Sequence, residues 1–139
     1  MDSEQLAAFL KRTGPALVGV ATTIRSDGSP HAVPVWYRWD GEVVNIWTRD
    51  ERRWVANIRR DRRVGFSVQE MEPPFAAVVI RGKAQVTTDA GPEVDEEIRA
   101  IAHRYLGEAE LDDYLAAWAE ARTLVRIHPS AIRSWTRGY

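Results

Sequence analysis

Cysteine is absent from this chain of 139 residues, and histidine occurs only three times. A chain without cysteine forms no disulfide, no thiolate metal site and no cysteine nucleophile, a composition compatible with a cytoplasmic location. His31, His103 and His128 are far apart in the sequence and show neither HxH nor HxxxH spacing. We therefore expect structural or surface roles for all three histidines, and no metal site.

Long apolar runs and familiar catalytic motifs are also missing. No stretch of about eighteen apolar residues occurs, and no charged-then-apolar leader opens the chain, so we expect neither a membrane span nor a signal peptide. The G-x-S-x-G motif and both glycine-rich phosphate-binding motifs are absent. If the protein is an enzyme, a bound cofactor is therefore expected to carry the chemistry.

Neither sign of charge is in excess, because 19 basic side chains and 20 acidic ones leave a net charge of −1. Nucleic-acid-binding domains are usually basic, so we expect no nucleic-acid partner. The apolar fraction of 45% is that of an ordinary soluble protein. The length predicts a single domain over residues 1–139, built around one core.

What the sequence does contain is a cluster of arginines within the fifteen residues 49–63. Asp50, Glu51 and Asp61 are the only acids among them, which leaves a local net charge of +4. The cluster lies where a predicted strand passes into a predicted helix, a natural place to hold a phosphate or carboxylate. The alternative is a solvated helix face whose arginines pair with acids elsewhere. The seven residues are Arg49, Arg52, Arg53, Arg59, Arg60, Arg62 and Arg63.

Tryptophan is unusually frequent, with six in the chain and four of them between Trp36 and Trp54. Flat side chains beside a cationic patch suit a flat anionic ligand. They also suit a β-rich core, or a dimer interface enriched in aromatic residues and arginine.

Hydrophobic patterning predicts six strands with helices inserted between them. Asp-Gly turns and short connections favour an antiparallel meander, so the expected fold is mainly β, an antiparallel β-barrel with peripheral helices. Pro34 marks an edge, a bulge or a bend, and Gly82 a bulge or a bend. Ser3 and Asp50 are the expected N-caps of the first two helices. The expected strands are 16–24, 31–39, 42–48, 63–69, 75–88 and 123–132; the expected helices are 3–12, 51–60, 92–105 and 111–119, with a loop at 89–92.

Several segments, taken in order, resemble one protein family. The run ATTIRSDGSPHAVPVWYRWDG at 21–41 is followed by Trp47-Thr48, by RRWVANIRRDRRVGFSV at 52–68 and by VVIRGKAQV at 78–86. This order is similar to that of the pyridoxamine 5′-phosphate oxidase-like split β-barrel family, and more narrowly to its flavin and deazaflavin oxidoreductase branch. The resemblance covers roughly residues 5–136, and it implies a six-stranded split barrel of the FMN-binding type with flanking helices.

The resemblance further implies a homodimer with cofactor sites at the subunit interface, each holding FMN or the deazaflavin coenzyme F-420. In such proteins the backbone of a P-V-W strand lies beside the tricyclic ring, and the residues after the third strand lie by the phosphate. The first group maps onto Pro34, Val35 and Trp36, and the second onto Thr48 and Arg49. The asparagine of the family motif corresponds to Asn57.

The chain departs from the family pattern three residues before Asn57, where Trp54 replaces a lysine that contacts the phosphate. Arg52 and Arg53 stand beside this position, and an arginine fork can replace the point charge with a different geometry. Trp54 itself either covers the barrel or the dimer seam, or stacks on cofactor or substrate. The expected cofactor-binding set is Pro34, Val35, Trp36, Trp47, Thr48, Arg49, Arg52, Arg53, Trp54 and Asn57.

The leading hypothesis is a flavin- or deazaflavin-dependent oxidoreductase that moves a hydride to or from a small conjugated substrate. No side chain stands out as an obligatory acid or base, so none is assigned a catalytic role. The alternative is a non-catalytic module that binds or sequesters a flavin or haem. A third hypothesis is an interaction protein with a vestigial slot, which the tryptophan at position 54 keeps open.

Overall fold

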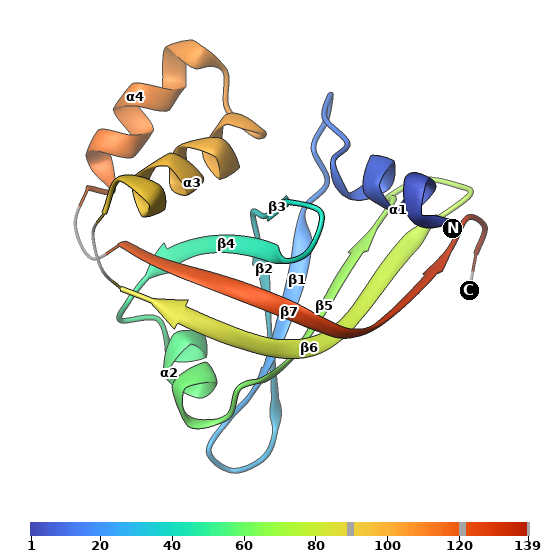
Figure 1. The fold of residues 1–139 in the computed structure, drawn as a ribbon, viewed down its shortest axis with the longest axis horizontal. Coiled ribbons are helices and arrows are strands. Elements are labelled where there is room, and N and C mark those ends of the chain that lie inside the picture. The colour runs from blue at the N-terminus through green and yellow to red at the C-terminus, as the bar shows by residue number, and fades with distance from the viewer. Residues whose placement is uncertain (89–90, 120–121, 139) are drawn as a thin grey trace.

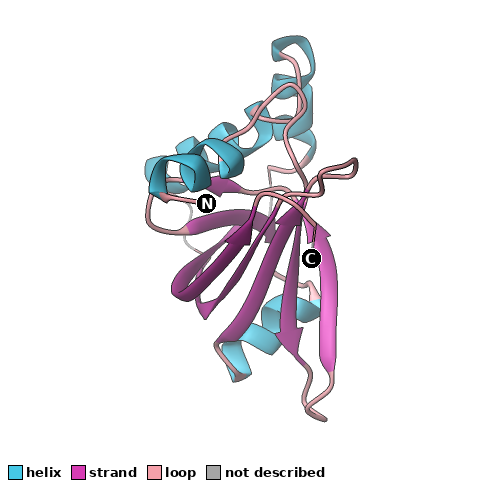
Figure 2. Ribbon diagram, turned by 90° about the vertical axis from the view of Figure 1, so that its right-hand side faces the viewer, coloured by secondary structure: helices cyan, strands magenta, loops and turns pink. Residues whose placement is uncertain are grey.

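One curled antiparallel sheet dominates the structure, a computed structural model that describes residues 1–88, 91–119 and 122–138. The sheet bends into a half-barrel, with α2 below it and α1, α3 and α4 above it in the view of Figure 2. The start of the loop expected at 89–92 lies outside the described residues. The predicted class, mainly β with flanking helices, is confirmed.

The helices and strands follow one another along the chain in the predicted order, apart from one additional strand, with boundaries shifted by a few residues (Figure 1). The elements are α1 (Ser3–Leu10), β1 (Gly19–Ile24), β2 (Pro30–Val35), β3 (Arg38–Trp39), β4 (Val44–Arg49), α2 (Arg53–Arg60), β5 (Arg63–Gln69), β6 (Ala77–Thr87), α3 (Pro92–His103), α4 (Glu108–Ala117) and β7 (Arg122–Trp135).

The sheet has seven strands, not the expected six, in the order β2-β1-β5-β6-β7-β4-β3. The additional strand arises because the single strand expected at 31–39 breaks at Trp36 and Tyr37. Its first half, β2, pairs with β1 at one edge of the sheet, and its second half, β3, pairs with β4 at the other edge. Pro34 lies in β2, an edge strand with a partner strand on one side only. An edge strand tolerates a proline, which has no N–H group to donate. The break therefore lets one continuous segment span the opening of the half-barrel.

Gly82 lies where β6 and β7 change register, as the sequence suggested for a bulge. Arg81 pairs with Ala131 but Gly82 pairs with Pro129, so the extra residue, Ser130, belongs to β7. A Cβ atom at Gly82 would lie 2.1 Å from the carbonyl oxygen of His128. Glycine is required here because the backbone of β7 approaches β6 too closely for any side chain.

Two hydrophobic clusters hold the helices to the sheet. The larger one fills the half-barrel, where Val55 and Ile58 of α2 are buried, as their spacing predicted, against β1 and β6. The smaller one joins α3 and α4 to β4 and β7 through Ile98, Ile101 and Leu124. Full burial of one such aliphatic side chain contributes roughly 1.5–3 kcal/mol.

The N-cap of α1 is Asp2 and not the expected Ser3. The Asp2 carboxylate accepts from the backbone N–H of Gln5 at 2.8 Å, and the Gln5 side chain accepts from the N–H of Asp2 at 2.9 Å. This reciprocal capping box satisfies two N–H groups that a serine one position later could not reach.

We predict that Gly82→Ala lowers the free energy of unfolding by about 1–3 kcal/mol, because the new methyl group forces two backbones apart. Gly65→Ala on the neighbouring strand β5 is a matched control, since its Cβ would meet the nearest heavy atom at 3.7 Å, an ordinary contact. Urea unfolding of both variants measures the difference. Equal stability of the two variants would contradict the close approach at Gly82.

Candidate functional site

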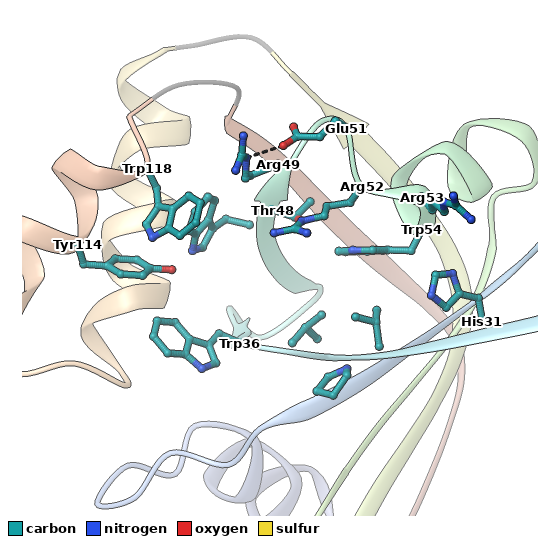
Figure 3. A pocket seen from close by; sticks show the side chains of 14 residues that line it. His31, Trp36, Thr48, Arg49, Glu51, Arg52, Arg53, Trp54, Tyr114 and Trp118 are labelled. Atoms are coloured by element: carbon teal, nitrogen blue, oxygen red, sulfur yellow. Dashed lines mark ion pairs between the residues drawn. The ribbon is translucent and has the colours of Figure 1, made fainter.

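A cleft of about 730 Å³ opens between the edge strand β2, the end of β4, the start of α2 and the helix α4 (Figure 3). Trp36, Tyr114 and Trp118 lie on one side of it, with Arg49 next to Trp118, whereas Arg52, Arg53 and Trp54 lie on the other side. The lining residues are His31, Val33, Pro34, Val35, Trp36, Trp47, Thr48, Arg49, Glu51, Arg52, Arg53, Trp54, Tyr114 and Trp118.

Most of the arginine cluster is engaged in the protein's own structure. Arg59 pairs with Asp50 and Arg63 pairs with Asp61 at 2.7 Å. Arg62 donates to the carbonyl oxygen of Ala84 at 3.1 Å. These interactions are those of a solvated helix face and its following turn, the alternative that the sequence left open.

Arg60 and Arg49 are also engaged. Arg60 donates to the carbonyl oxygen of Ile24 at 2.7 Å and to the Asn57 side chain at 3.0 Å. Arg49 lines the cleft, but its Nε lies 2.6 Å from the carboxylate of Glu51, and its guanidinium lies over the Trp118 ring at 5.4 Å. The charge of Arg49 is therefore largely balanced within the protein.

Arg52 and Arg53 are different. Both are exposed and line the cleft, and no acidic side chain of the described residues forms an ion pair with either of them. Arg52 is the N-cap of α2, and no described side chain caps the first turn of this helix. Two arginines and the positive end of a helix therefore border the same cleft, an arrangement that favours an anionic group.

Asp50 is not the cap of α2 that its position predicted. Its carboxylate pairs with Arg59 and also accepts from the Thr123 hydroxyl at 3.3 Å. The hydrogen bond from Arg59 is the largest cause that lowers the pKa of Asp50. Because Asp50 does not cap the helix, no described side chain accepts from the N–H groups of Arg53 and Trp54, whereas the N–H of Val55 donates to the carbonyl oxygen of Arg52 at 3.1 Å.

Four aromatic side chains form the opposite side of the cleft. Trp36 lies 5.4 Å from Tyr114 between ring centroids, and Trp47 lies 5.9 Å from Tyr114 and 6.4 Å from Trp118. Figure 3 shows the Tyr114 hydroxyl directed from α4 into the space between these rings. Burial raises the pKa of Tyr114, so its hydroxyl keeps its proton. This wall offers a broad apolar surface with one polar tip.

Trp36 is held in place by a brace of two residues, Arg104 and Tyr105, that directly follow α3. Its ring stacks on Tyr105 at 4.8 Å with planes 7° apart. The Tyr105 hydroxyl donates to the carbonyl oxygen of Leu17 at 2.8 Å and accepts from the backbone N–H of Tyr37 at 3.2 Å. Arg104 donates to the carbonyl oxygen of Tyr37 and to that of Leu10, the latter at 3.1 Å. Tyr105 thus fixes the chain at the break between β2 and β3.

The structure brings nine of the ten predicted cofactor-binding residues to this one cleft. Asn57 does not line it, because its buried side chain points to Thr23 and His31 instead. Trp54 is only 4% exposed and packs in the core, as expected if it covers the barrel, and it also lines the cleft.

Sequence reasoning missed five lining residues: His31, Val33, Glu51, Tyr114 and Trp118. Tyr114 and Trp118 are four residues apart, a spacing that places two side chains on one face of a helix. That spacing was visible in the sequence, but nothing local indicated that this face would cover the end of β4. His31 was read as a structural or surface residue.

No group of three or more histidine, acidic or cysteine side chains that could hold a metal ion occurs in the part of the chain that the structure describes. Nor does any helix among the described residues have the length and apolar character needed to cross a membrane.

The chain belongs to the pyridoxamine 5′-phosphate oxidase family, whose model matches residues 3–136. No curated protein matches the sequence. Among solved structures, a conserved hypothetical protein from Mycobacterium tuberculosis has a TM-score of 0.79 at 25% identity over 97% of this chain and 84% of its own. An F-420 reductase has a TM-score of 0.70 at 25% identity over 91% of this chain and 94% of its own. A candidate pyridoxamine 5′-phosphate oxidase from Listeria innocua has a TM-score of 0.70 at 21% identity over 95% and 96%.

We predict that the free energy of unfolding of the protein decreases at alkaline pH because Tyr37 loses its proton. Burial raises the pKa of Tyr37 from 10.0 to about 12, and its hydroxyl donates to the carbonyl oxygen of Leu10 at 2.8 Å. The unfolded chain loses this proton first, so the stabilisation is complete below about pH 10 and is lost as the pH rises toward 12, by up to about 2–3 kcal/mol.

Urea unfolding between about pH 9 and pH 11.5 tests this prediction on the wild type and Tyr37→Phe. The variant is expected to be less stable by about 1 kcal/mol at neutral pH, because it lacks the hydrogen bond. Its stability should fall less steeply with rising pH than that of the wild type. Parallel pH profiles of the two proteins would show that Tyr37 does not titrate as stated.

Proposed function

We propose that the protein is an oxidoreductase that binds a flavin-type cofactor, FMN or coenzyme F-420, in this cleft. It transfers a hydride to or from a small conjugated substrate. The observation that carries the proposal is the pairing of two unneutralised guanidinium groups, Arg52 and Arg53, with an aromatic wall across the cleft. Membership of the family and the similarity to an F-420 reductase support the same class of reaction.

The residues present fit such a cofactor at both of its ends. Arg52, Arg53 and the N-terminus of α2, which no described side chain caps, would hold the anionic end. The strand β2 at Pro34 and Val35 would lie along the tricyclic ring, with Trp36 and Trp47 excluding water from it. When bound, the ring supplies the chemistry of accepting or donating a hydride. The protein supplies position, charge and a dry surface.

A homodimer is part of the proposal. Val20 of β1 and Val79 of β6 each pair with Ser67 of β5, so both valines lie on the same face of the sheet. They are 36% and 37% exposed, which leaves two apolar side chains on this face, on either side of Ser67. A second copy packed on this face would bury them.

The choice between the two cofactors depends on the anionic end. Coenzyme F-420 has the longer polyanionic tail and would gain more from several cations. Arg49 adds a third guanidinium at the rim, although Glu51 balances it at 2.6 Å. We therefore favour F-420 and test both.

We predict that Arg53→Ala weakens cofactor binding roughly ten- to a hundredfold, because one charge-assisted hydrogen bond is lost from an anionic group. Titration of the purified protein with FMN and with F-420, followed by cofactor fluorescence, measures the two dissociation constants. Arg63→Ala is the matched control, since it removes the same charge from the same cluster but does not touch the cleft.

The opposite change is informative in the same titration. Glu51→Gln frees Arg49 from its ion pair, so binding of the anionic cofactor should become tighter. Equal affinity of wild type, Arg53→Ala and Arg63→Ala would remove Arg53 from the site. Tight binding of a cofactor that no reductant can reduce would favour the non-catalytic module over the oxidoreductase.

A further inference from the structure

His31 of β2 lines the cleft beside Arg53 and Trp54, and its ring is held from behind by a chain of side chains (Figure 3). The Nδ1 atom of His31 lies 3.4 Å from Nδ2 of Asn57. The same Asn57 nitrogen donates to the Thr23 hydroxyl oxygen at 3.1 Å. Its amide oxygen accepts from Arg60 at 3.0 Å.

The contact with Arg60 fixes which way the Asn57 amide points. A guanidinium only donates, so the Asn57 atom that faces Arg60 must be the oxygen, and the NH₂ group faces Thr23 and His31. An NH₂ group also only donates, so Nδ1 of His31 must accept. In a neutral imidazole the proton then resides on Nε2.

The Nε2 atom has no hydrogen-bond partner among the described residues. Its N–H group is therefore the polar atom of His31 that remains for a ligand in the cleft. His31 lies on the same side of the cleft as Arg53, one of the two lining arginines that no described acid neutralises.

We propose that His31 is a ligand-binding residue that donates an Nε2–H hydrogen bond to an anionic oxygen in the cleft. Asn57 is the positioning residue that selects this tautomer, and Arg60 orients Asn57. The identity of the ligand as a flavin-type cofactor rests on the proposed function, but the tautomer and the bond to an anionic oxygen do not. Asn57 does not line the cleft, so in this proposal it acts on the ligand only through His31.

The tautomer is tested by nitrogen-detected NMR of the three histidine rings in alkaline buffer, where imidazole is neutral. His31 is expected to carry its proton on Nε2 in the wild type. Asn57→Asp replaces the donor that faces Nδ1 with an acceptor, so the proton should move to Nδ1. The exposed His103 and His128 are internal controls whose ring signals should not change. A His31 ring that keeps its proton on Nε2 in folded Asn57→Asp would overturn the positioning role.

Ligand contact is tested with the same signals. Addition of inorganic pyrophosphate, and separately of FMN and F-420, should shift the Nε2 signal of His31 and leave that of His103 unchanged. His31→Ala should weaken binding of the probe roughly tenfold, the effect of one lost hydrogen bond to a charged group. This half of the test needs no substitution at the buried Asn57.

A double-mutant cycle separates the two residues. Asn57→Asp alone should weaken binding of the probe. The same substitution should weaken it much less in a protein that already carries His31→Ala, because Asn57 acts through His31. Equal losses in both backgrounds would mean that the added carboxylate acts by charge alone.

If neither cofactor binds but pyrophosphate shifts His31, the proposed function fails and this inference stands. If no probe shifts His31, the inference is wrong whatever else the cleft binds.

Discussion

The uneven neutralisation of one arginine cluster is the constraint on which the site depends. Seven guanidinium groups lie within fifteen residues, and the protein engages five of them in ion pairs or hydrogen bonds. Arg52 and Arg53 are left without an acidic partner in the described part of the chain, at a helix start that no side chain caps. Because Asp50 is drawn to Arg59, the potential at this point stays positive. The positive charge that no described acid balances, that of Arg52 and Arg53, therefore lies at the cleft.

The fold places an apolar surface opposite that charge. The break at Trp36 and Tyr37 sends one segment from one edge of the sheet to the other, so β2 and β4 end at the same opening. Tyr105 and Arg104 fasten the break to α3, while α4 lays Tyr114 beside Trp47. Backbone edge, rings and cations thus come from four separate parts of the chain. A planar molecule with a charged end matches this distribution better than a compact polar one.

Local pattern predicted most of the fold, because turns, periodic apolar residues and the arginine cluster act over a few residues. It could not predict the seventh strand, since only the closing of the half-barrel forces the break after Val35. The pairing of Asp50 with Arg59 across nine residues was likewise invisible, so the wrong residue was expected at the helix cap. For the site, the segments around Pro34, Thr48 and Arg53 were correctly expected together. Tyr114 and His31 were missed because their roles arise from tertiary contacts with β4 and Asn57.

The most direct test is a crystal structure of the protein grown with FMN or coenzyme F-420. The account predicts anionic oxygens of the cofactor within hydrogen-bonding distance of the Arg52 and Arg53 side chains, and its ring beside Val35 and Trp36. A cofactor whose charged end is bound elsewhere, with both guanidinium groups facing bulk water, would contradict it.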